Sequence, residues 1–200
     1  TNTGSGSLII DTSGNVGIGV TPAAHSSLFT ALDIDNTALT AFNDVVGIWE
    51  ANTYYDGSNY KYRANGYAGQ VLINNGGEFQ VKQAVSGTAG ASATLVQNFT
   101  IDSSGNVLVG KTGLAIGTVG TEVRNNGQLL VTANGDNPVD LNRLTSDGTI
   151  ANFRKDGTTV GSISVKSGSI AFGQSDTGLG FFNTDRLDRK STRLNSSHSQ

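Results

Sequence analysis

Few side chains in this 200-residue sequence could carry acid–base or nucleophilic chemistry. The histidines are His25, in a polar stretch, and His198, so few residues could supply the histidine of a hydrolytic triad. Asp11 and Asp102 occupy equivalent places in two copies of an Asp-x-Ser-Gly-Asn motif and could serve as the paired acids of a glycoside hydrolase. Their shared turn context instead favours capping of the local backbone. We therefore predict no catalytic residue and no enzyme activity.

Cofactor and metal patterns point the same way. Val16-Gly17-Ile18-Gly19 lacks the third glycine and the following helix of a dinucleotide-binding loop. The sequence has no cysteine, which excludes disulfides and thiolate metal sites. Oxygen-rich turns could bind calcium, but the glycine-rich nonapeptide of calcium-binding β-rolls is absent. We expect neither a cofactor nor a metal ion.

One aromatic segment is the candidate ligand-binding site. It contains all the tyrosines and the single tryptophan, and Lys61 and Arg63 add charged donors. Tyr and Trp combine an apolar ring with a polar tip, which suits a glycan or a cell-surface protein. The alternative, which the Asp56-Gly57 turn favours, is a cross-strand ladder that only stabilises a hairpin. The candidate residues are Trp49, Tyr54, Tyr55, Tyr60, Tyr62 and Tyr67.

The elements that would position these residues are short β-hairpins. The segment Ile9–Gly19 recurs at Thr100–Gly110, with an offset of 91 (102 minus 11), and Asn74–Val81 recurs more loosely about 50 residues later, at Asn125–Val131. Each copy of the first repeat predicts a strand, a turn and a second strand. The bare face of Gly17 would let another backbone approach closely, as between packed neighbouring chains.

Asx-Gly pairs predict further turns, and alternating apolar residues predict further strands. Apolar residues alternate at Val71 and Ile73 and at Ile163 and Val165, which predicts strands. Residues 28–42 could be argued as a helix, but the alternation of Leu32-Asp33-Ile34 favours strand and loop. Tight turns are predicted at Asp56-Gly57, Asn65-Gly66, Asn75-Gly76, Asn126-Gly127, Asp147-Gly148 and Asp156-Gly157.

Composition limits the classes of partner. Glycine, at 27 residues, adds no core volume, and charged residues make up only 14% of the chain. The net charge of -3 gives no electrostatic attraction to nucleic acid. No apolar run approaches the roughly 18 residues of a membrane span. We expect an all-β chain without a thick core of its own, no nucleic acid and no membrane insertion.

These motifs together resemble tail-fibre-like proteins of environmental bacteriophages. The resemblance covers roughly residues 8–187, and such proteins often carry an endosialidase-type intramolecular chaperone further downstream, for which this sequence offers no match. It rests on four segments in this order: Ile10–Gly19, Tyr54–Tyr62, Ile101–Gly110 and Ser146–Gly157.

The resemblance implies an elongated homo-oligomer, a trimeric fibre built as a β-prism or from interlaced strands, with a hydrophobic core shared between chains. It also implies a structural virion protein of the phage tail, outside the cell, that attaches to a host surface glycan or protein. A bacterial extracellular repeat adhesin and a polysaccharide-degrading tailspike are the alternatives.

Four segments are expected along the chain. Residues 1–50 would form an N-terminal hairpin module, 51–98 an aromatic-rich β module and 99–187 the C-terminal hairpin repeats. Residues 188–200 are polar, do not alternate and resemble a translated sequencing adaptor or vector. We expect this last segment to be unstructured and not native, and the chain to be a piece of a longer protein.

Overall fold

The computed structural model describes residues 7–42, 46–174 and 177–180, and in these ranges it contains strands, turns and loops but no helix. The all-β prediction is confirmed, and residues 28–42 form strands as predicted. The chain divides into unit 1 (residues 1–138) and unit 2 (residues 139–200), which we describe separately. The strands of unit 1 are β1 (Leu8–Ile10), β2 (Val16–Ile18), β3 (Phe29–Ile34), β4 (Thr37–Phe42), β5 (Val46–Ala51), β6 (Thr53–Tyr55), β7 (Tyr60–Tyr62), β8 (Gly66–Ile73), β9 (Phe79–Gly87), β10 (Val96–Ile101), β11 (Val107–Val109), β12 (Gly120–Val123) and β13 (Leu129–Thr132).

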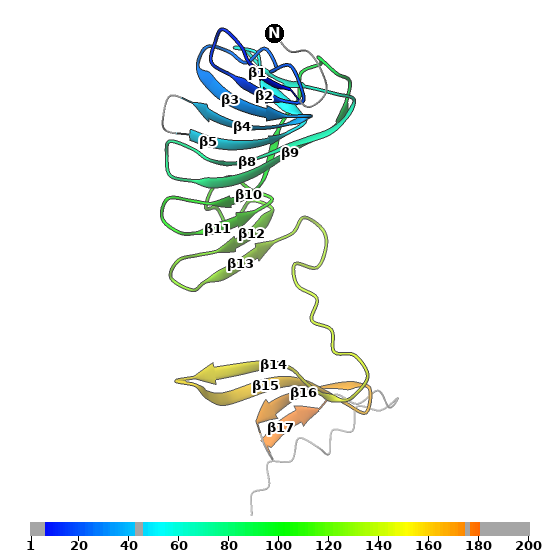
Figure 1. Ribbon diagram of the computed structural model, residues 1–200. Helices are drawn as coiled ribbons and strands as arrows, with labels where there is room; N and C mark the ends of the chain where they lie inside the picture. Colours follow the sequence, from blue (N-terminus) through cyan, green and yellow to red (C-terminus); the bar gives the residue numbers. More distant parts are fainter. Residues whose placement is uncertain (1–6, 43–45, 175–176, 181–200) are drawn as a thin grey trace, which may run out of the picture. The chain divides into compact units, whose positions relative to one another are not determined.

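Unit 1 is built on a single 11-stranded sheet with the order β1-β2-β3-β4-β5-β8-β9-β10-β11-β12-β13 (Figure 1). Adjacent strands are antiparallel except β2 and β3, which are parallel. The hairpin β6–β7 branches off between β5 and β8 as a separate two-stranded sheet. Apart from β6 and β7, the strands follow one another in the sheet in the order of the sequence.

Four hairpin turns of unit 1 share one geometry. In each five-residue turn the first N–H donates to the fifth carbonyl, and the fourth N–H donates to the first carbonyl. The fourth residue is always a glycine, with φ between +78° and +86°, a region that side chains disfavour. Both sequence repeats thus form the predicted hairpins. The turns span 11–15, 74–78, 102–106 and 124–128.

Most of the predicted Asx-Gly turns are hairpin turns, and two are not. Asp56-Gly57, Asn75-Gly76, Asn126-Gly127 and Asp156-Gly157 connect paired strands. The prediction of tight turns at Asn65-Gly66 and Asp147-Gly148 was wrong, because each glycine is the first residue of a strand, β8 or β14. Their φ angles of +136° and +146° lie away from those of hairpin turns.

Cross-strand register divides the sheet of unit 1 into two faces. One residue from each strand aligns across the whole sheet, and residues two positions away on the longer strands flank this line. We call this side the apolar face and its aligned residues the central row. The central row is Ile10, Val16, Leu32, Leu39, Trp49, Val71, Val81, Phe99, Val109, Thr121 and Val131.

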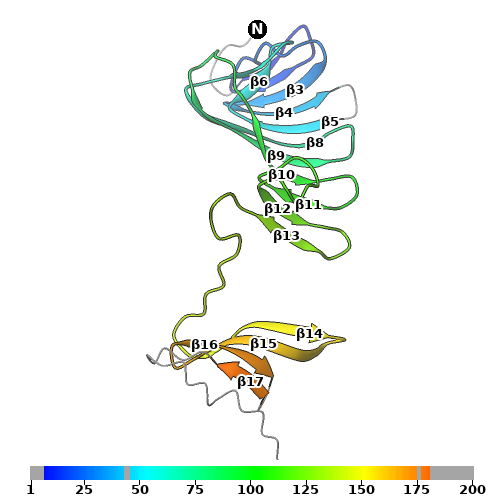
Figure 2. The same cartoon turned by 180° about the vertical axis from the view of Figure 1, so that it is seen from behind.

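The opposite side, which we call the covered face, holds the core. Loops and the β6–β7 hairpin lie over it, and β6 is visible in the rear view of Figure 2. Tyr62 packs with three alanines, and Phe29, Ile48 and Leu72 form a second cluster with Tyr55. At Gly17 the predicted close backbone approach comes from the same chain, because an added Cβ would lie 2.1 Å from the carbonyl oxygen of Val20.

Unit 2 is a four-stranded antiparallel sheet in sequence order. Ile163 pairs with Phe172 and Val165 with Ile170, so one face gathers apolar residues as the alternation predicted. No residue described between 139 and 173 is buried. The strands are β14 (Gly148–Lys155), β15 (Thr158–Lys166), β16 (Ser169–Gln174) and β17 (Thr177–Gly180).

The expected segment boundaries stay a prediction. Those at 50/51 and 98/99 fall within β5 and β10, and residues 188–200 lie outside the described ranges. Within the described part of the chain, no helix is present that is long and apolar enough to cross a membrane.

Candidate functional site

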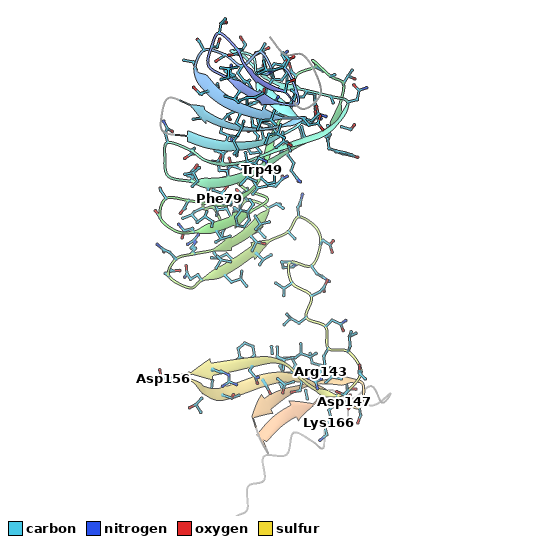
Figure 3. All side chains as sticks on the ribbon, viewed as in Figure 1. Trp49, Phe79, Arg143, Asp147, Asp156 and Lys166 are labelled. Atoms are coloured by element: carbon cyan, nitrogen blue, oxygen red, sulfur yellow. The ribbon has the colours of Figure 1, made fainter. Side chains whose placement is uncertain are left out.

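Unit 1 leaves many side chains of its apolar face accessible. Leu39 and Trp49 keep 57% and 54% of their surface exposed, and Ile34 and Ile73 beside the row keep 49% and 55%. Every member of the central row is exposed or partly exposed. Trp49 and Phe79, which belong to this face, are labelled in Figure 3. Single exposed apolar residues are ordinary, but a contiguous face marks an interaction surface.

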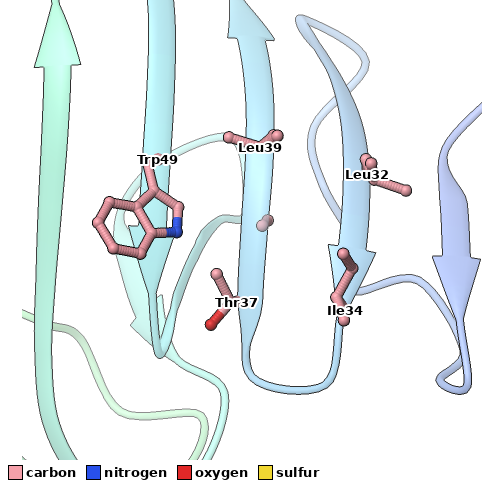
Figure 4. Close-up of a pocket in the computed structure, with 6 residues that line it drawn as sticks. Leu32, Ile34, Thr37, Leu39 and Trp49 are labelled. Carbon is pink, nitrogen blue, oxygen red and sulfur yellow. The ribbon is translucent and has the colours of Figure 1, made fainter.

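Trp49 borders a shallow hollow on this face. The hollow has a volume of about 220 Å³ and is lined by Leu32, Ile34, Thr37, Ala38, Leu39 and Trp49. Figure 4 shows Leu32, Leu39 and Trp49 side by side on three adjacent strands, with Ile34 and Thr37 near the β3–β4 turn. Such an apolar recess fits a hydrophobic side chain of a partner.

The covered face contains a buried ionic network centred on Asp33. Asp33 accepts hydrogen bonds from the backbone N–H of Ala23 at 2.6 Å and from Arg63 at 2.8 Å, and His25 Nε2 lies 3.1 Å away. Arg63 also donates from Nε to the carbonyl of Thr53. Burial would raise the pKa of Asp33, but the bonds from His25 and Arg63 outweigh it and hold that pKa at about 2. The network fastens loop 19–28 and the β6–β7 hairpin to the sheet.

Glu50 is a second buried carboxyl, and no cation of the described residues lies within bonding distance of it. Its carboxyl oxygens accept hydrogen bonds from the hydroxyls of Thr40 at 3.2 Å and Thr53 at 3.5 Å. Burial raises the pKa of Glu50 to about 7. Near neutral pH this carboxyl is therefore poised between its protonated and ionised forms.

A third buried carboxyl, Glu122, fastens loop 110–119. It accepts hydrogen bonds from Lys111 at 2.6 Å, from the backbone N–H of Ala115 at 2.7 Å and from Arg124 at 2.9 Å. Lys111 also donates to the carbonyls of Ala115 and Thr118. The bond from Lys111 lowers the pKa of Glu122 to about 2. This cluster connects loop backbone to the sheet.

Asp11 and Asp102 lie in equivalent turns and do not form a carboxyl pair. Their hairpins are separated by β3, β4, β5, β8 and β9 in the sheet. Each caps its own turn, since Asp102 accepts the backbone N–H groups of Ser104 and Asn106 and the side-chain amide of Asn106. That amide bond is the main reason why the pKa of Asp102 is lowered. The capping interpretation is confirmed.

The structure separates the six predicted aromatic residues. Trp49 lies on the apolar face, whereas the four tyrosines of β6 and β7 lie over the covered face. Tyr62 is buried at 4% exposure, with its hydroxyl donating to the carbonyl of Val85, and Tyr55 packs between Phe29 and Tyr60. Tyr54 has Arg63 6.0 Å from its ring centre. Tyr67, in β8, is 78% exposed. The six residues therefore do not share one surface.

What the apolar face offers to a partner is apolar contact. The buried carboxyls of Asp33, Glu50 and Glu122 have no exposed surface. Among the same residues, no group of three or more His, Cys, Asp or Glu side chains could hold a metal ion. Reasoning from sequence missed the apolar face as a site, although the alternation at Val71 and Ile73 was its signal. It also missed the buried acids, two of which alternate with apolar residues in Leu32-Asp33-Ile34 and in Trp49-Glu50-Ala51.

Comparison of this chain with protein-family models, with curated protein sequences and with solved structures gives no significant match.

Proposed function

We propose that this chain is a structural segment of a bacteriophage tail fibre or related virion protein, which assembles from several copies and takes part in host attachment. The observation that carries the proposal is that each unit rests on a single sheet whose apolar face lies open within the chain. A sheet of this kind gains its stability when a neighbour covers that face. Subunits of an oligomeric fibre supply such a neighbour to one another.

Unit 2 supports the proposal most directly. Phe153 and Val160 are 53% and 52% exposed, and Ile170 and Phe172 are 44% and 41% exposed. Burying large side chains of this kind contributes about 1.5–3 kcal/mol each, and a lone chain leaves much of this contribution unused. We infer that the sheet of unit 2 is completed by other chains of the fibre.

Host attachment is assigned to the aromatic residues that lie outside the central row and remain accessible. Tyr67 is the most exposed of the six, and Tyr54, Tyr55 and Tyr60 keep part of their surface. Their rings offer apolar faces to a cell-surface glycan or protein. Trp49 belongs to the central row and is excluded from this role.

The test of assembly is the solution mass of the 200-residue chain, measured by light scattering after size exclusion, with far-ultraviolet circular dichroism on the same peak. We expect β-rich particles with the mass of three 20.6-kDa chains. A folded β-rich particle with the mass of one chain would contradict the proposal.

The test of attachment is binding of the fluorescently labelled chain to a panel of bacterial strains. Tyr67→Ala should weaken binding to the strain that is recognised and leave the solution mass unchanged. Val139→Ala, which shortens an exposed apolar side chain outside the strands, is the control. Equal binding by both variants would remove Tyr67 from the contact surface.

A further inference from the structure

We propose that the apolar face of unit 1 packs against the same face of further copies of this chain, parallel and in register, with the central row innermost. This inference rests on the proposed function and specifies which surface joins the chains. The hollow beside Trp49 then receives an apolar side chain of the neighbouring copy. Four observations carry the proposal.

The first observation is the continuity of the central row. It has one residue in each of the eleven strands, and ten of these are apolar, with Thr121 as the exception. On the strands long enough to show it, the row is flanked on both sides by residues of the same face, such as Ile34 and Ile73. Apolar residues placed by chance would not occupy the aligned position on nearly every strand of a sheet.

The second observation is size. At a strand spacing of about 4.8 Å the row is about 48 Å long, and rows about 7 Å apart give a face on the order of 700–1,000 Å². A stable protein interface buries about 800 Å² per partner. The face is therefore large enough to hold a second copy without help from other surfaces.

The third observation is charge. None of the central-row residues, nor any residue two positions away within the same strand, is Asp, Glu, Lys or Arg. The ionic groups Asp33, Glu50 and Glu122 all lie on the covered face with no exposed surface. An uncharged face is complementary to itself, whereas a charged one would repel its own copy. This favours a second copy of the chain over a charged partner.

The fourth observation is the alternation of large and small residues around Trp49. Ala41 and Gly47 lie on one side of the row at this level, and Ala51 and Gly69 lie on the other. A Cβ added at Gly47 would meet no atom within 4 Å. In-register association places Trp49 of one copy at the level of these small residues in the next, which gives its ring room to pack.

The experiment compares two leucines that are equally exposed within one chain. Leu39, in the central row, and Leu141, outside any strand, are both 57% exposed. The full chain is made as Leu39→Asp and as Leu141→Asp, and light scattering gives the mass of each at one protein concentration. We expect Leu39→Asp to shift the mass from that of the oligomer to that of one chain, and Leu141→Asp to keep the oligomer mass.

The outcomes separate this inference from the proposed function. If the unmodified chain is a folded single chain, the proposed function fails and this inference fails with it. If the unmodified chain is an oligomer and Leu39→Asp keeps its mass, the copies associate through another surface and only this inference is overturned. The same holds if Leu39→Asp gives single chains and Leu141→Asp does so equally.

A second measurement covers the case in which Leu39→Asp does not fold. Because the chain has no cysteine, Thr121→Cys places a single thiol in the central row and Ser104→Cys places one in an exposed turn. A short bis-maleimide should cross-link chains of Thr121→Cys and leave Ser104→Cys uncross-linked. An oligomer that is cross-linked at Ser104→Cys and not at Thr121→Cys would overturn the proposal.

Discussion

On the covered face of unit 1, Asp33, Glu50 and Glu122 have no exposed surface, whereas on the apolar face Leu39 and Trp49 keep more than half of theirs. The difference follows from what lies over each face. Loops and a hairpin close the covered face, and loop backbone brings N–H and C=O groups that need partners when buried. Asp33 and Glu122 supply such partners to Ala23 and Ala115.

Among the described residues, no loop buries the central row of the apolar face, whose members are all exposed or partly exposed. Its side chains can bury themselves only against a surface that is itself regular and apolar. The polarity of each face therefore depends on what covers it. The face covered by loop backbone carries buried acidic residues, whereas the face left open within the chain carries apolar ones. Five predictions test this contrast.

The largest effect is expected from breaking the Asp33 network. Arg63→Met should lower the free energy of unfolding by about 3–5 kcal/mol, because it leaves the buried carboxylate of Asp33 without its cation. Lys61→Met is the control, since Lys61 forms a more exposed ion pair with Asp56 at 3.7 Å and should lose less than about 1 kcal/mol. Urea unfolding followed by circular dichroism measures both. Equal losses would mean that the covered face does not depend on this network.

The next effect concerns Glu50 and pH. The pKa of Glu50 is about 7 in the folded chain, above its usual 4.5, so its stabilising contribution is complete below pH 4.5 and is lost as the pH rises toward 7 and beyond. Between pH 5 and 8 the unmodified chain should lose on the order of 2 kcal/mol of unfolding free energy. Glu50→Gln, which cannot ionise, should lose much less over the same window.

The acids with lowered pKa values should make the free energy of unfolding depend on pH in the opposite direction and in a lower pH range. The pKa values of Asp33 and Glu122 are both about 2, so their contribution is present above pH 4.5 and is lost as the pH falls toward 2. The unmodified chain and Glu50→Gln should share that acid loss. A parallel loss for both chains between pH 5 and 8 would contradict the assignment of Glu50.

A smaller effect is expected at the repeated turns that border the covered face. The buried Asn106 donates to Asp102 at 2.8 Å and accepts the N–H of Asn125 at 2.9 Å. Asn106→Ala should cost about 1–2 kcal/mol, because it leaves these partners unsatisfied. Ser103→Ala, in the exposed part of the same turn, should cost less than about 0.5 kcal/mol. Thermal unfolding of the two variants at equal concentration would show whether the asparagine or the turn as a whole matters.

A substitution at Gly47 should have the smallest effect on the stability of the single chain, but a measurable effect on assembly. A Cβ there meets no atom of its own chain, so Gly47→Val should change the stability of one chain by less than about 0.5 kcal/mol. It should still reduce the fraction of oligomer, because the new side chain occupies the space opposite the neighbouring Trp49. Gly113→Val, equally unobstructed within the chain, should leave the fraction unchanged. Sedimentation velocity distinguishes the two results.

The sequence by itself determined the class of fold and most of its turns. The Asp-x-Ser-Gly-Asn repeat required a hairpin, because its aspartate can cap its own backbone and its glycine can adopt positive φ. Apolar alternation placed Val71 and Ile73 on one face, since side chains in a strand alternate with a period of two. Both features are local, and both appear in the structure.

Only the tertiary structure decided which face is inside and which residues meet. Alternation in Leu32-Asp33-Ile34 separates the acid from its neighbours but does not say which side is covered. The pairing of Asp33 with Arg63 joins residues that are 30 positions apart, and it arises because the β6–β7 hairpin folds back over the sheet. The aromatic segment was divided for the same reason, since Trp49 lies on the opposite face from Tyr62. Burial depends on which segments lie over a face, and that information is not local to any strand.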